Sequence, residues 1–205
     1  MRVLSLSYCF PNADSPSWGV FVMQRLAAMA RRAELEVAAP VPVFPLWTRR
    51  SARLPAREVL GGLTVHRPRF FYVPGLCKDL DGWFYARGLR RWLREYLAAR
   101  PVDLLDAHFV WPDGVGVARL ARREGLPYAI TLRGKIYPCL ERPRQRAQCA
   151  EALRGAAAVL SVSGPMAQVA RELGTEARRV HVIPNGVDTE RFRPADRAAA
   201  RRDLG

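Results

Sequence analysis

The 205-residue sequence has few cysteines, almost no lysine and no long apolar run. No uninterrupted apolar stretch approaches the roughly 18 residues that a membrane-spanning helix needs, so we do not expect an integral membrane protein. The N-terminus reaches Pro11 before the apolar core of a signal peptide could form. The four cysteines form no CxxC pair, which argues against a zinc knuckle or a disulfide framework; they are Cys9, Cys77, Cys139 and Cys149. We therefore expect a soluble, cytoplasmic protein.

Acidic residues are also scarce, with 19 Asp and Glu against 33 Lys and Arg, which gives a formal charge of +14. Such a charge could serve a nucleic acid, an anionic membrane or an acidic ligand. Only Lys78 and Lys135 are lysines, and the arginines are spread from Arg2 to Arg202 instead of forming one tail. This spread favours a solvated arginine-rich surface, and no RRM, KH, zinc-finger or helix-turn-helix signature is visible. We expect no nucleic-acid partner.

Strand-like and helix-like segments alternate along most of the chain. Short apolar runs predict buried strands, and apolar residues at intervals of three and four predict amphipathic helices. The first 40 residues read as strand, loop, helix and strand, which is typical of a right-handed βαβ unit. Residues 40–60 are proline-rich and predict an irregular connection, and Pro68 interrupts a strand near a sheet edge. The predicted strands cover residues 2–8, 35–39, 64–72, 102–108, 128–132, 157–162 and 179–183, and the predicted helices cover 19–32, 79–99, 113–124, 141–154 and 165–173.

This order predicts an α/β fold, a Rossmann-like, doubly wound and mainly parallel sheet. Ligands bind such sheets at the carboxyl ends of the strands, so the residues there are the candidates for a site. Gly19 opens the first helix, where free backbone N–H groups favour an anion, although a plain turn explains it equally well. His108 ends a strand and could hydrogen-bond a sugar hydroxyl, transfer a proton, or simply be a satisfied core histidine.

Two further loops carry polar groups at strand ends. Arg133, Gly134 and Lys135 place two cations around a glycine, which suits phosphate or carboxylate better than a metal. Asn185 and Gly186 follow Pro184 and predict a tight turn with positive φ that presents backbone amides and the Asp188 carboxylate. No set of Asp, Glu, His or Cys has metal-ligand spacing, so we expect no metal site. The fingerprints GxGxxG, GxxxxGK[ST] and GxSxG are absent.

Taken together, these segments resemble the N-terminal half of a family 4 glycosyltransferase of the GT-B fold. The matching segments are WGVFVMQRLAAMA, AAPVPVFP, DAHFVWPDG, ITLRG, VLSVS and VIPNGVDTERFRP, in the family's order and over nearly the whole chain. The resemblance implies an acceptor-side Rossmann-like domain over residues 1–194. Residues 195–205 would begin the linker to a C-terminal domain that binds the donor and is absent here. The family's E-x7-E element belongs to that second half, so the chain alone should not transfer sugar efficiently.

The resemblance also implies a reaction and a set of partners. Bacterial members move a sugar from a nucleotide sugar to a surface polysaccharide or glycolipid and retain the anomeric configuration. By resemblance His108 would be catalytic, and no cofactor beyond the nucleotide-sugar co-substrate is expected. The substrate-binding candidates are Trp18, Gly19, Arg133, Gly134, Lys135, Asn185, Gly186 and Asp188.

Two positions depart from the family pattern. Trp18 stands where many relatives have the first of two glycines, and Arg133 where many have histidine; arginine keeps the hydrogen-bond donors but cannot act as a base. The acceptor would be a sugar or a lipid-linked sugar, and the arginine-rich helix over 79–99 could touch anionic lipid at the inner face of the plasma membrane. The alternative is a truncated, inactive carbohydrate-binding or partner module, and a less favoured one is a basic nucleic-acid-binding protein.

Overall fold

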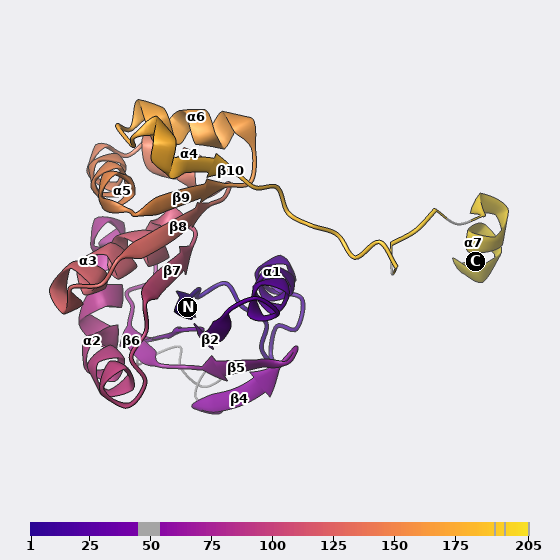
Figure 1. The fold of residues 1–205 in the computed structure, drawn as a ribbon, viewed down its shortest axis with the longest axis horizontal. Helices are drawn as coiled ribbons and strands as arrows, with labels where there is room; N and C mark the ends of the chain where they lie inside the picture. The colour runs from indigo at the N-terminus through magenta and orange to yellow at the C-terminus, as the bar shows by residue number, and fades with distance from the viewer. Residues whose placement is uncertain (45–53, 191, 195, 205) are drawn as a thin grey trace.

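Eight strands form one sheet in the order β10-β9-β8-β7-β1-β2-β5-β4, and β3 and β6 pair separately. The structure is a computed structural model, and it describes residues 1–44, 54–190, 192–194 and 196–204 (Figure 1). All neighbours in the large sheet are parallel except β4 and β5, so the predicted mainly parallel α/β sheet is confirmed. The strands are β1 (Arg2–Leu6), β2 (Glu34–Ala38), β3 (Val41–Val43), β4 (Arg57–Leu60), β5 (Leu63–His66), β6 (Arg69–Phe71), β7 (Leu104–His108), β8 (Tyr128–Leu132), β9 (Ala158–Ser161) and β10 (Val180–Val182).

Helices cover both faces of the sheet and bury two separate cores. Side chains alternate across a strand, so Val3 and Leu4 of β1 face opposite cores. The helix α1 packs against β2 and β5 on one face, while α2, α3, α5 and α6 cover the other. Burial on both faces explains why the strands read as nearly continuous apolar runs. The helices are α1 (Val20–Ala30), α2 (Asp81–Ala99), α3 (Val115–Glu124), α4 (Ile136–Leu140), α5 (Pro143–Gly155), α6 (Gly164–Glu172) and α7 (Arg197–Leu204).

The strand order reverses at β1, which lies between β2 and β7. On one side of β1 the sheet continues with β2 and β5. On the other side it continues with β7, β8, β9 and β10, which come later in the sequence. The carboxyl ends of β1 and β7 therefore flank the switch point, where open α/β sheets bind ligands. The loop from Ser7 to Gly19 and the side chain of His108 both lie at this point.

The region between β2 and α2 differs most from the sequence prediction. The expected irregular connection contains β3 and β4, and the part of it over residues 45–53 lies outside the described residues. The strand expected over 64–72 is two strands, β5 in the large sheet and β6 beside β3. Pro68 separates them, since proline cannot continue a hydrogen-bonded ladder. Its predicted position near an edge is correct, because β5 adjoins the edge strand β4.

Smaller differences occur in the second half. The predicted helix over 113–124 is preceded by an irregular helical turn, Val110–Gly114, and the loop after Lys135 holds the short helix α4. Ser163 occupies the cap position of α6 as expected, with Pro165 in the first turn. Its side chain makes no capping bond; instead the Ser161 hydroxyl donates to the Ser163 carbonyl at 2.7 Å.

After β10 the chain leaves the sheet. Figure 1 shows an extended segment that runs away from the strands to α7, drawn in yellow. The described residues from Ile183 to Glu190 are all exposed. The predicted division between residues 194 and 195 stays a prediction. Among the residues that the structure describes, no helix is both long and apolar enough to cross a membrane.

Candidate functional site

The loop between β1 and α1 favours glycine at position 19. Gly19 has φ of 76°, and a Cβ there would lie 2.3 Å from the carbonyl oxygen of Cys9. This close packing turns the chain into α1, whose first turn carries no acidic residue and no side-chain cap. The first N–H groups of α1 are therefore available to an anion at the switch point.

Beside this helix end, two aromatic rings and a lysine form an open platform. Trp18 is 47% exposed, and its ring centroid lies 6.4 Å from that of Tyr8. The Lys135 ammonium donates to the Tyr8 hydroxyl and lies 4.9 Å from the centre of its ring. Burial acts to lower the pKa of Lys135, but the Tyr8 hydroxyl and nearby negative groups raise it on balance. An exposed ring next to a protonated amine suits a sugar that carries an acidic group.

Arg133 is buried in the structure. The sequence predicted instead a cation on an exposed loop, because Arg133 follows a strand. Only 4% of the residue is exposed, because its guanidinium packs 4.7 Å from the centre of the Phe21 ring and 5.9 Å from that of Phe109. Its Nη1 donates to the Asn185 side-chain oxygen at 3.0 Å, while Nε and Nη2 have no hydrogen-bond partner in the described part of the chain. Burial and the charge of Arg25 lower its pKa to about 10.

Arg25 and Arg133 hold the start of the exposed C-terminal segment from two different elements. Arg25 of α1 donates to the Ile183 carbonyl oxygen at 3.3 Å, two residues before Asn185. These contacts fasten the segment just where it leaves β10. The predicted tight turn with positive φ at Asn185 and Gly186 is wrong, since neither residue has positive φ. With Asn185 held by Arg133, this stretch continues as extended chain.

His108 is fully buried at the end of β7. Its Nε2 lies 3.1 Å from Oδ2 of Asp106, and the Ser5 hydroxyl donates to the same oxygen at 2.7 Å. Burial works to raise the pKa of Asp106, but the imidazole and the Ser5 hydroxyl hold it below its usual value. The ring thus belongs to a buried polar row under the site, and its predicted catalytic role stays a prediction.

A second buried carboxyl connects this turn to the first loop. Asp113 is fully buried, and its Oδ1 accepts the backbone N–H of Tyr8 at 2.8 Å. Burial raises the pKa of Asp113 to about 7, despite the hydrogen bond from Tyr8 and the positive charge of Lys135. The Asp113 carboxyl therefore ties the Tyr8 backbone, and with it the aromatic platform, to the turn that follows β7.

The structure thus brings together most of the predicted site residues, and it adds some. Trp18, Gly19, Arg133, Lys135 and Asn185 meet around the switch point. Gly134 lies beside them on the exposed loop between β8 and α4, whereas Gly186 and Asp188 lie farther along the exposed segment. Sequence reasoning missed the parts played by Tyr8, Arg25 and Asp106; only Asp106 carried a signal, because it precedes His108 by two residues and so shares its face of the strand.

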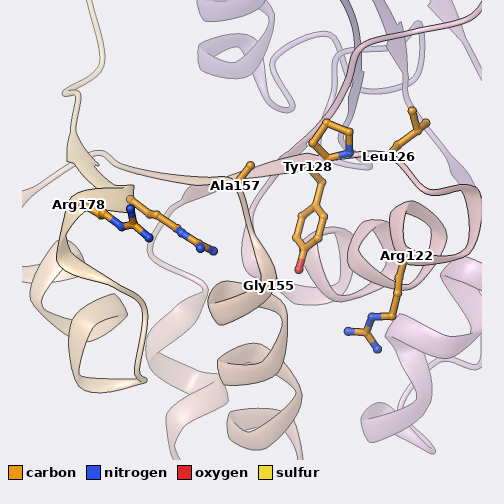
Figure 2. A pocket seen from close by; sticks show the side chains of 8 residues that line it. Arg122, Leu126, Tyr128, Gly155, Ala157 and Arg178 are labelled. Atoms are coloured by element: carbon orange, nitrogen blue, oxygen red, sulfur yellow. The ribbon is translucent and has the colours of Figure 1, made fainter.

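One hollow lies at the other edge of the sheet, where β8 and β9 begin. Figure 2 shows Tyr128 between Arg178 and Arg122, and the cavity measures about 680 Å³. Its arginines already have carboxylate partners, with Arg122 2.9 Å from Glu151 and Arg178 2.6 Å from Glu176. Because ligands of parallel sheets bind at the carboxyl ends, we assign the site to the switch point.

The described residues hold no group of three or more His, Cys, Asp or Glu side chains placed to bind a metal ion. The chemistry that these residues offer is therefore that of cations, backbone amides, aromatic faces and one imidazole. Such groups bind and orient a polar, anionic ligand.

Comparisons with known proteins identify relatives of this chain. TuaC of Bacillus subtilis (strain 168), whose name assigns it to teichuronic acid biosynthesis as a glycosyltransferase, is 27% identical over 210 residues, which cover 94% of this chain and 51% of TuaC. Among solved structures, sucrose-phosphate synthase from Thermosynechococcus elongatus matches 99% of this chain and 52% of its own, with a TM-score of 0.72 and 16% identity. Anabaena Alr3699/HepE in complex with UDP-glucose matches 100% of this chain and 50% of its own, with a TM-score of 0.63 and 17% identity.

The chain therefore spans about half the length of the relatives that it matches. The fold matches about half of each of these two solved structures, and it is the fold of the N-terminal half of a GT-B protein, as predicted. The sequence pattern of Glycosyltransferase Family 4 matches residues 18–191. This match covers most of the chain, and the chain belongs to glycosyltransferase family 4.

Proposed function

We propose that this chain is the acceptor-side domain of a retaining glycosyltransferase, which moves a hexose from a nucleotide sugar to a polysaccharide or glycolipid acceptor. The observation that carries the proposal is the grouping of Trp18, Gly19, Arg133 and Lys135 at the switch point of the sheet. A neutral-sugar site would need no such excess of buried and exposed cations. The solved neighbours described as complexes with UDP or UDP-glucose support a nucleotide-sugar partner.

Each group then has a role that its position allows. The Trp18 and Tyr8 rings stack on the acceptor sugar, and Lys135 binds an acidic group on it. The amides that follow Gly19 approach the phosphates of the donor, which the second domain would hold. Arg133 stabilises negative charge on the leaving phosphate from below and orients Asn185, while Gly134, Gly186 and Asp188 line the approach. The reaction needs no metal in this proposal, because positioning and charge stabilisation supply the catalysis.

The proposal requires the donor-binding half, so this chain by itself should be inactive. The test uses the longest natural polypeptide that contains this chain, incubated with a panel of nucleotide sugars and a membrane or polysaccharide acceptor extract from the source cells. We expect acceptor-dependent release of nucleoside diphosphate and a product with the donor's anomeric configuration. In the same assay His108→Ala should lower kcat by roughly 100-fold or more. Absence of release with every donor would instead favour an inactive binding module.

A contact with anionic membrane is the second proposal, and the exposed face of α2 supports it. Leu80 and Trp83 are 47% and 46% exposed, and Arg87, Arg91 and Arg94 continue the same face toward the end of the helix. The apolar end of this face is near the site. Asp81, the first residue of α2, accepts a hydrogen bond from the side chain of Trp111 in the turn after β7. A helix that lies on the inner leaflet along this face would bring a lipid-linked acceptor to the aromatic platform.

A further inference from the structure

We propose that Asp106 is a positioning residue that holds His108 in the tautomer with a proton on Nε2, so that Nδ1 accepts a hydrogen bond from a ligand hydroxyl. The inference rests on the proposed function in one respect, since it assumes that the ligand at this site bears hydroxyl groups. The orientation of the imidazole itself follows from the described residues alone.

The backbone places the two side chains together. Residues two apart in a strand point to the same face, so Asp106 and His108 of β7 both face α1. Ser5 of β1 is the direct partner of Asp106 in the sheet register and lies on the same face. All three side chains are nearly or fully buried, at 0% exposure for Ser5, 2% for Asp106 and 0% for His108. Ser5, Asp106 and His108 therefore form a fixed row with no bulk water to compete.

The protonation of the imidazole follows from the chemistry of its neighbour. Asp106 is held ionised by the imidazole, the Ser5 hydroxyl and the charge of Arg25, so its oxygens can only accept. With Nε2 only 3.1 Å from a carboxylate oxygen, a proton on Nε2 is attracted by the Asp106 charge and a lone pair is repelled by it, so the charge favours the tautomer that is protonated on Nε2. The N–H does not point straight at the oxygen, which makes the contact chiefly an electrostatic one.

With the proton on Nε2, a neutral His108 presents a lone pair on Nδ1. Nδ1 is buried and has no hydrogen-bond partner in the described part of the chain, and the same holds for the Thr131 hydroxyl on the paired position of β8. A buried acceptor without a donor is costly, so a hydroxyl or a water molecule that reaches it gains a strong hydrogen bond. The row thus prepares His108 to receive a hydrogen bond and not to give one.

The test is the tautomeric state of His108, read from the nitrogen NMR signals of the present chain labelled with ¹⁵N-histidine. We expect one tautomer near neutral pH, with Nε2 protonated and Nδ1 unprotonated. Asp106→Asn and Asp106→Ala should each raise the share of the Nδ1-protonated tautomer. Asp103→Asn serves as the matched control, because it removes the same charge just before β7 and should leave both signals in place.

A wild-type His108 that is protonated on Nδ1 would overturn the inference, and so would Asp106 variants that leave both nitrogen signals unchanged. The wild-type measurement needs no variant to fold. It also needs no substrate, so it is independent of the proposed activity. If His108→Ala left the transfer rate of the full enzyme unchanged, the proposed role of His108 would fail while the role of Asp106 in orienting the ring would stand.

Discussion

The buried carboxyl of Asp113 should make stability depend on pH. Its pKa of about 7 exceeds the ordinary value, so the folded chain retains a proton that the unfolded chain has lost. Stability should therefore fall as the pH rises from about 4 to about 7, by at most about 4 kcal/mol at 1.36 kcal/mol for each unit. Asp113→Asn keeps an oxygen for the Tyr8 N–H and cannot ionise. The difference between the two unfolding free energies, measured in urea from pH 5 to 8, should move in favour of the variant as the pH rises; a constant difference would contradict this account.

Two glycines in the site should differ in how much stability the same substitution costs. Gly19→Ala should destabilise the chain by about 1–3 kcal/mol, since the residue has φ of 76° and a Cβ would clash with the Cys9 carbonyl oxygen. Gly134→Ala is the control, because none of the residues that the structure describes lies within 4 Å of its added Cβ, and the change should stay within about 0.5 kcal/mol. The measurement is the urea unfolding midpoint of each variant. Equal midpoints would contradict the prediction and show that the loop before α1 adapts to alanine at position 19.

At the scale of single elements, the exposed face of α2 should bind anionic lipid. We expect the chain to co-sediment with vesicles that contain phosphatidylglycerol and to be released by salt. Arg87→Gln combined with Arg94→Gln should weaken binding by roughly 30-fold, from about 1 kcal/mol for each arginine. Arg122→Gln combined with Arg178→Gln, at the opposite edge of the sheet, removes the same charge and should weaken lipid binding less. Equal losses in both pairs would mean that only net charge matters.

The secondary structure elements could mostly be predicted from the sequence, because a period of two or 3.6 in apolar residues reflects burial against one or two faces. The helix over residues 79–99 and the strands over 102–108 and 128–132 illustrate this. The pairing of β3 with β6 could not be predicted, since each has three residues and its partner lies more than 20 residues away in sequence. The helical turn at Val110–Gly114 was missed because its irregular backbone follows no apolar period.

For the candidate site, the rule that ligands bind at strand ends led to residues that the structure brings together, but it did not predict their environment. Arg133 was expected on an open loop, yet Phe21 and Phe109, from distant parts of the chain, cover it. The exposure of Asn185 and its bond to Arg133 depend on packing between α1, β8 and the segment after β10. No single stretch of sequence contains such information.

At the scale of the whole molecule, the charge of +14 is consistent with an anionic partner. The basic residues that carry this charge are spread along the chain and do not cluster at one end. The two buried cores and the mainly parallel sheet make a rigid base for the loops at the switch point. The chain also covers only about half the length of each relative that it matches. We propose that the ligands of this chain bind at the switch point of the sheet.

The most direct test is to measure the changes in the amide NMR chemical shifts of the present chain during titration. The ligands are UDP-glucose and, separately, the methyl glycosides of glucose and glucuronic acid. We predict that the shifts gather in residues 7–20, 131–137 and 183–186, and that the glucuronide binds more tightly than the glucoside because of Lys135. Lys135→Gln should remove that preference. Shifts gathered instead around Arg122, Tyr128 and Arg178, at the opposite edge, would contradict the assignment of the site.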